Sequence, residues 1–154
     1  MIERDLSLTG DFAIVNEAVR RYVPGFSAHG FRLTEVTLEG SAKLQRFPVF
    51  HFLNEHTAMG IDVSFISATG GLNGGFTVLL IKPGKHKLDV EDYLKSHERE
   101  GLTRFFTYRD PATDVRGFAD TFLQMFVGLL DRDLKPIIEG KTFEETPIDW
   151  MGYK

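Results

Sequence analysis

The stretch QRFPVFHFLNEHTAMGIDVSFIS, residues 45–67, decides the fold of this chain. Its first half is rich in aromatic and β-branched side chains, and NEHT, residues 54–57, has the composition of a four-residue turn. After the turn, IDVSF (residues 61–65) alternates apolar with polar side chains, as a strand with one buried face does. The stretch therefore predicts an antiparallel hairpin with one face in the core.

The first strand of this hairpin carries two different faces. One face holds Phe47, Val49, His51 and Leu53, and the other holds Arg46, Pro48, Phe50 and Phe52. Because proline has no backbone N–H to donate, Pro48 predicts that the strand lies at a sheet edge or carries a bulge.

Helices and further strands are expected on both sides of the hairpin. The expected elements are a helix from Asp11 that stops at Pro24 and Gly25, a strand over 31–38, a buried strand over 76–82, a helix capped by Asp89 and closed by Gly101, a short strand within 103–109, and a helix from Val115 that continues past Pro136 to Gly140. This order predicts an α+β fold, with an antiparallel meander of four to five strands, an N-terminal helix and two helices of the C-terminal half packed on it. Residues 1–154 are expected to form a single compact domain.

Composition narrows the class of protein. The 154 residues are 42% hydrophobic and 26% charged, which is typical of a globular domain in water. A net charge of −4 gives no basic surface for nucleic acid. The N-terminal MIERDLSLTG lacks the apolar core of a signal peptide, and no window is long enough to span a membrane. We therefore expect a cytoplasmic protein that binds neither nucleic acid nor membrane.

Cysteine is absent, so disulfides, thiol nucleophiles and thiolate metal sites are excluded. Phenylalanine is unusually common, with 14 residues against one tryptophan. Its ring has no polar group, so most of these rings are expected in the core.

The glycine-rich stretch SATGGLNGGF, residues 67–76, raises the question of a phosphate-binding loop. Its glycines at 70, 71, 74 and 75 include no pair with the spacing of a dinucleotide-binding motif, and a strand follows instead of a helix. Gly70 and Gly75 have the glycine spacing of a P-loop, but Phe76 stands where that motif requires lysine. The spacing favours a flexible turn, and no cofactor is expected.

Two further motifs resemble catalytic ones only in part. GFSAHG, residues 25–30, lacks the glycine that a nucleophile elbow places two residues after the serine. HEREG, residues 97–101, has Gly101 where a zinc-protease helix has its second histidine. We therefore expect no catalytic residue from either motif.

The stretch HFLNEH, residues 51–56, holds the polar cluster that carries the most chemistry. His51, Glu55 and His56 lie close together in sequence, and Asp62 follows on the partner strand. Two histidines and a carboxylate suit a divalent metal or acid–base chemistry, provided that the strand and the turn bring them together. The alternative is a polar hairpin tip with one hydrogen-bonded histidine, and the sequence favours it, so no metal is predicted.

The layout of the chain resembles that of small bacterial α+β proteins of unknown function, some of them regarded as candidate immunity proteins against toxins. The resemblance rests on RRYVPGFSAHGFRLTEV (20–36), VFHFLNEHTAMGIDVSFI (49–66), LDVEDYL (88–94) and LKPIIEG (134–140). It covers most of the chain as a pattern of elements and transfers no functional residue.

Two classes of function follow from the sequence. The first is a non-catalytic protein-binding domain, such as an immunity-type protein that binds a toxin, or a secretion-type chaperone, which would form a homodimer. Its partner is expected on an acidic surface formed by Asp89, Glu91, Asp92, Glu98 and Glu100, or at a sheet edge. The alternative is a small-molecule-binding protein or modest hydrolase, with a Phe-lined pocket on the sheet face and His51 or Tyr108 as its polar group.

Overall fold

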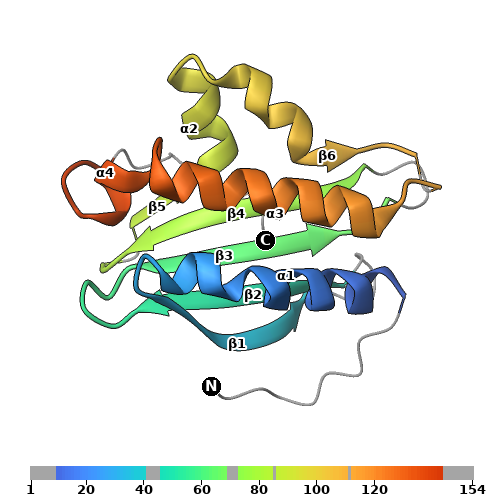
Figure 1. Ribbon diagram of the computed structural model, residues 1–154, viewed down its shortest axis with the longest axis horizontal. Helices are drawn as coiled ribbons and strands as arrows, with labels where there is room; N and C mark the ends of the chain where they lie inside the picture. Colours follow the sequence, from blue (N-terminus) through green and yellow to red (C-terminus); the bar gives the residue numbers. More distant parts are fainter. Residues whose placement is uncertain (1–9, 41–45, 69–72, 85, 111, 144–154) are drawn as a thin grey trace.

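The structure is a computed structural model of the chain, and it describes residues 10–40, 46–68, 73–84, 86–110 and 112–143. An antiparallel sheet lies behind two long helices (Figure 1). The elements in chain order are α1 (Asp11–Ser27), β1 (Phe31–Glu39), β2 (Phe47–Asn54), β3 (Gly60–Ile66), β4 (Gly74–Lys82), β5 (His86–Asp89), α2 (Val90–Ser96), the 3-10 helix η1 (Glu100–Phe105), β6 (Thr107–Tyr108), α3 (Val115–Asp131) and α4 (Lys135–Ile138).

The strands run in the order β1-β2-β3-β4-β5, so each strand pairs with the next one in sequence. The short strand β6 also pairs with β4, beside Gly74 and Gly75, whereas β5 pairs with the other end of β4. The predicted α+β meander, with one helix before the sheet and further helices after it, is therefore confirmed.

One hydrophobic core fills the space between the sheet and the helices. α1 and α3 contact each other along the front of the sheet (Figure 1). Aromatic rings join the layers: Phe26 of α1 stacks on Phe52 of β2 with ring centroids 4.0 Å apart, and Phe122 of α3 stacks on Phe76 of β4 at 4.2 Å. These rings are buried, which confirms the expectation that the phenylalanines form the core.

The alternation predicted for the hairpin is also confirmed. Ile61, Val63 and Phe65 are fully buried under the helices, as are Phe50 and Phe52 of β2. His51 lies between Phe50 and Phe52 in sequence, so its side chain points to the other face of the sheet. The buried rings of Phe50 and Phe52 therefore pack on the opposite side of the sheet from the His51 side chain.

α1 does not stop at Pro24 and Gly25 but continues to Ser27. A Cβ atom on Gly25 would lie 2.8 Å from Cγ1 of Val127 in α3. Glycine is therefore required at this position for the close approach of two helices, and it does not terminate one. The sequence prediction of the helix end was wrong because the partner helix lies about a hundred residues further along the chain.

Two other boundaries differ from those predicted. Asp89 caps α2 as expected, since its side chain accepts a hydrogen bond from the backbone N–H of Asp92 at 3.2 Å. However, α2 ends at Ser96 and Glu98 adopts the left-handed conformation (φ 60°), whereas Gly101 belongs to η1. The strand expected within 103–109 is reduced to Thr107 and Tyr108.

Pro48 does not mark an edge strand, because β2 pairs with β1 on one side and β3 on the other. Its pairing with β3 begins one residue later, at Val49 and Ser64. The bulge lies in the neighbouring strand instead, between Leu33 and Glu35 of β1.

Candidate functional site

Polar side chains gather on the sheet face opposite the core. The buried side chains of the described helices belong to the same core cluster as the inward residues of the sheet, so these helices lie on one face. On the other face, cross-strand pairing places Glu35, His51, Asp62 and Leu79 in one row across β1 to β4. We call this surface the open face, meaning the face that carries none of the described helices.

His51 links three strands at the centre of the open face. Its Nδ1 lies 2.8 Å from Oδ1 of Asp62 on β3, and its Nε2 lies 2.8 Å from Oγ1 of Thr37 on β1. The Thr37 hydroxyl in turn lies 3.1 Å from Oε2 of Glu39. The result is a hydrogen-bonded chain from Asp62 through His51 and Thr37 to Glu39.

This chain favours a positively charged imidazole. The hydrogen bond with Asp62 raises the pKa of His51 above its ordinary value, and the charges of Asp62, Glu39 and Glu35 add to the rise against the opposing effect of burial. About a quarter of the His51 side chain is exposed, as is about a quarter of Asp62, so both groups are in contact with solvent.

The geometry of Asp62, His51 and Thr37 resembles that of a carboxylate, a base and a nucleophile in acyl transfer. Glu39 argues against this chemistry. Its carboxylate lies beside the Thr37 hydroxyl, where catalysis needs donors that stabilise developing negative charge. The arrangement is therefore suited to holding a proton and a charge at a surface.

A hollow of about 410 Å³ lies next to His51 on the open face. It forms because Gly60 pairs with Leu53 on one side and Ile81 on the other, so one position in this row has no side chain. A Cβ atom on Gly60 would meet its nearest neighbours at 3.5 and 3.7 Å, which is ordinary van der Waals contact. The hollow is apolar on two sides and polar toward His51 and Asp62.

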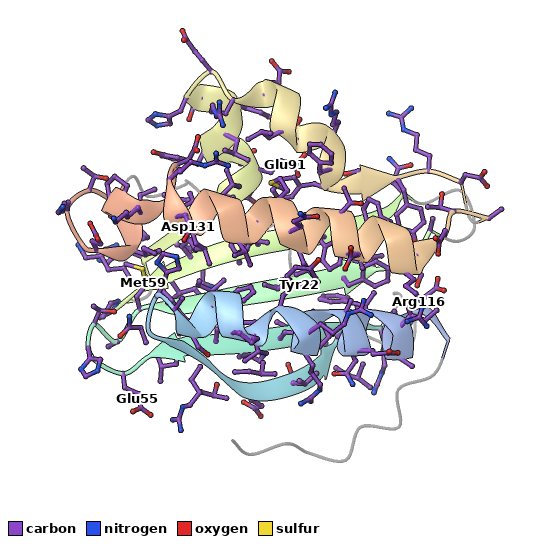
Figure 2. All side chains as sticks on the ribbon, in the orientation of Figure 1. Tyr22, Glu55, Met59, Glu91, Arg116 and Asp131 are labelled. Atoms are coloured by element: carbon purple, nitrogen blue, oxygen red, sulfur yellow. The ribbon has the colours of Figure 1, made fainter. Side chains whose placement is uncertain are left out.

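Glu55 and His56 do not join His51 and Asp62. Glu55 forms an ion pair with Arg32 and projects from the β2–β3 turn at one end of the sheet (Figure 2). The backbone N–H of His56 donates to the side-chain oxygen of Asn54 at 2.9 Å, as expected in a polar hairpin tip. Among the described residues, no group of three or more histidine or carboxylate side chains is placed to hold a metal ion.

The five acidic residues proposed as a partner surface have different roles. Asp89 is the α2 cap, and burial raises its pKa. Glu91 is half-buried, and burial raises its pKa although Lys95 lies 3.9 Å away. Asp92, Glu98 and Glu100 are exposed. Glu91 lies on α2, well apart from Glu55 at the hairpin tip (Figure 2), so these two sequence candidates do not belong to one surface.

Tyr108, the other polar group considered for a pocket, has a structural role. Its side chain is buried, and its hydroxyl oxygen accepts a hydrogen bond from the backbone N–H of Ala68 at 3.1 Å. Burial raises the pKa of the Tyr108 phenol. It therefore ties β6 to the segment that follows β3, and it lies in the core, away from His51.

Sequence reasoning found His51 and Asp62 but missed Thr37, Glu39 and Gly60. A signal for Thr37 and Glu39 was present in the alternation of β1, which sends both to the same face as His51. Gly60 follows the hairpin turn in sequence and looks like part of it, so only its pairing with Leu53 and Ile81 shows its role.

Removing the Asp62 charge is expected to lower the pKa of His51 and to weaken the pH dependence of stability. The pKa of His51 is higher in the folded chain than in the unfolded chain, where it is about 6.5. The protonated histidine therefore stabilises the fold fully when the pH is below the unfolded pKa, and this contribution is lost as pH rises through the folded pKa. When the pH is raised from about 6 to about 9, the free energy of unfolding of Asp62→Asn is expected to fall by about 1 kcal/mol less than that of the parent chain. The difference is small because solvent screens the partly exposed side chains of His51 and Asp62.

Chemical denaturation at the two pH values measures this difference. Glu17→Gln is the control, since it removes an exposed carboxylate on α1, which pairs with Arg116 and not with a histidine. Equal pH dependence in the parent and Asp62→Asn would show that the pair does not hold the proton.

No protein-family model, curated protein or solved structure matches the chain. None of the helices in the described part of the chain is long and apolar enough to cross a membrane. The function is therefore inferred from the geometry of the chain's own side chains.

Proposed function

We propose that this protein is a non-catalytic binding domain that recognises another protein through its open face. The observation that carries the proposal is the hollow at Gly60, which lies beside Leu53, a large apolar side chain that is 36% exposed. An apolar depression with a hydrogen-bonded polar group at its rim is the arrangement that receives an anchoring side chain of a partner.

The shape of the hollow favours a protein over a small molecule. Pockets for small molecules enclose most of the ligand surface. Here Gly60 lacks a side chain between its paired neighbours Leu53 and Ile81, so the hollow lies on the surface of the sheet. A protruding apolar side chain fills such a space, while the surrounding strands supply the rest of the contact area.

A toxin is the class of partner that the resemblance to candidate immunity proteins favours. In that case the chain protects cells against the toxin by covering part of the toxin surface. Asp92, Glu98 and Glu100 form a competing surface at α2 and η1, where the basic residues Lys95 and Arg99 are interleaved with them. A hollow of about 330 Å³ lies at this surface too, lined by Glu98, Arg99, Gly101, Leu102 and Arg104. The open face is favoured because its hollow lies beside the exposed Leu53 and the hydrogen-bonded pair of His51 and Asp62.

Filling the hollow is expected to weaken partner binding while the fold is kept. Gly60→Val adds a β-branched side chain at a strand position with ordinary backbone geometry, so it favours the strand. Loss of one buried anchor lowers affinity by about tenfold or more. Retention of a partner from the native cell, and protection against a toxin encoded beside the gene, are the two measurements.

Gly101→Ala is the matched control, since its added methyl group has nothing within 4 Å. Gly60→Ala serves if the valine variant does not fold. A triple variant, Asp92→Asn with Glu98→Gln and Glu100→Gln, is expected to bind as well as the parent. Binding by Gly60→Val at the parent level, or loss of binding in the triple variant, would contradict the proposal.

A further inference from the structure

The hydroxyl of Thr37 has two close polar neighbours but only one proton to donate. His51 Nε2 lies 2.8 Å from its oxygen and Glu39 Oε2 lies 3.1 Å away. A carboxylate accepts hydrogen bonds and cannot donate one. Both contacts are therefore hydrogen bonds at the same time only when His51 Nε2 carries a proton and donates it to Thr37.

Deprotonation of the imidazole changes this pattern. A carboxylate at Asp62 accepts a hydrogen bond only from a protonated Nδ1, so we expect the neutral ring to keep its proton on Nδ1 and its lone pair on Nε2. The lone pair is then an acceptor for the Thr37 hydroxyl, which must turn away from Glu39 to donate to it.

We propose that Thr37 is a hydroxyl switch that transmits the protonation state of His51 to Glu39. With His51 protonated, the hydroxyl donates to Glu39 and holds this carboxylate against β1. With His51 neutral, the hydroxyl donates to Nε2 and the Glu39 carboxylate is released. Half of the Glu39 side chain is exposed, so the released group moves into solvent at the end of strand β1.

The charges around His51 set the direction of the switch. Glu35 and Glu39 face it from β1 and Asp62 faces it from β3, and all three carboxylates favour the protonated ring. Lys82 of β4 lines the hollow, and its Nζ lies 5.8 Å from the centroid of the Phe143 ring. Arg32 is turned toward Glu55. Because the pKa of His51 is raised, chiefly by the hydrogen bond with Asp62, the ring loses its proton at a higher pH than an unperturbed imidazole does.

The switch is independent of the proposed function, because it is a property of the folded chain without a partner. Its consequence is a surface whose charge depends on pH. As pH rises, the cluster of Glu35, Glu39, Asp62 and His51 loses one positive charge, and Glu39 is no longer held by the threonine.

NMR of the side chains tests this inference in the full chain. The carboxyl carbons of Glu39 and Glu35 and the ring nitrogens of His51 are followed through the pH range in which His51 titrates. Thr37→Val removes the hydroxyl and keeps a β-branched side chain of similar volume, and Thr37→Ser keeps the hydroxyl. Glu35 is the internal control, since it acts on His51 through its charge.

In the parent chain we expect the neutral form of the ring, present at high pH, to carry its proton on Nδ1. We also expect the chemical shift of the Glu39 carboxyl carbon to change in a step at the midpoint of the His51 titration. In Thr37→Val the Glu39 step is expected to shrink by about half or more, because only the direct charge effect remains. The Glu35 step is expected to stay, and Thr37→Ser is expected to behave as the parent.

A Glu39 step of equal size in the parent and Thr37→Val would overturn the switch, as would a neutral ring protonated on Nε2. Glu39→Gln, at a half-exposed position, provides a second measurement if Thr37→Val does not fold. It is expected to lower the pKa of His51 relative to the parent chain, because the Glu39 carboxylate lies 3.6 Å from His51 Nε2 and favours the charged ring. An unchanged pKa would count against the connection between the two groups.

Discussion

Phe122→Ala is expected to lower the free energy of unfolding by about 3–5 kcal/mol, as truncation of a fully buried ring does. Phe122 of α3 is fully buried and contacts the rings of Phe76, Phe106 and Phe126. It stacks on Phe76 of β4 at 4.2 Å, meets Phe106 edge-on at 4.9 Å and lies 6.1 Å from Phe126 of its own helix. Truncation leaves a cavity where these elements meet, and close-packed rings cannot collapse into it without losing their own contacts.

Urea denaturation of the parent and the variant measures the loss. Phe105→Ala is the matched control, because this ring of η1 is only partly buried and lies 4.9 Å from the Arg104 guanidinium at the surface. It is expected to cost clearly less than Phe122→Ala. Equal losses at the two positions would show that the helices do not pack on the sheet through Phe122.

Gly75→Ala is the second large effect, with an expected loss of about 3 kcal/mol or more. Gly75 has φ 145°, a conformation that other residues rarely adopt. A Cβ atom there would lie 2.0 Å from the backbone oxygen of Phe106. That oxygen accepts a hydrogen bond from the Phe76 N–H at 2.7 Å, so the clash is with a backbone group that cannot rotate away.

Hydrogen exchange provides the specific readout for Gly75→Ala. The Phe76 amide is expected to exchange faster, since separation of β6 from β4 breaks its hydrogen bond, while amides in the β1–β2 pair keep their protection. Gly101→Ala is again the control, because its added methyl group meets nothing within 4 Å. Unchanged protection at Phe76 would mean that β6 does not lie against Gly75.

The local features of the fold were predictable because they depend on neighbours in sequence. The alternation of IDVSF places Ile61, Val63 and Phe65 in the core, since successive strand residues point to opposite faces. Asp89 precedes a helix that needs a hydrogen-bond acceptor at its start, and its side chain provides one.

The glycines were interpreted wrongly for a physical reason. Gly74 and Gly75 look like a flexible turn before a strand, but both lie within β4. A Cβ atom on Gly74 would lie 2.5 Å from the ring of Tyr108, and one on Gly75 would meet Phe106. These contacts come from residues more than thirty positions away, and local sequence contains no sign of them.

The candidate site was predictable only in part. The sequence placed His51 and Asp62 on partner strands, but it also grouped them with Glu55 and His56, which lie at the hairpin tip. Whether His51 meets Asp62 depends on strand register, and a shift of one residue would turn either side chain to the opposite face.

The sequence by itself determined the α+β class, the buried face of the strand that follows the hairpin turn and the absence of thiol chemistry, because patterning and composition act over a few residues at a time. Only the tertiary structure decided that Asp62, His51, Thr37 and Glu39 form one chain, and that Gly60 leaves a hollow between Leu53 and Ile81. Both features join side chains from three adjacent strands. Their distances are set by register and by the bulge in β1, which exist only once the sheet has formed.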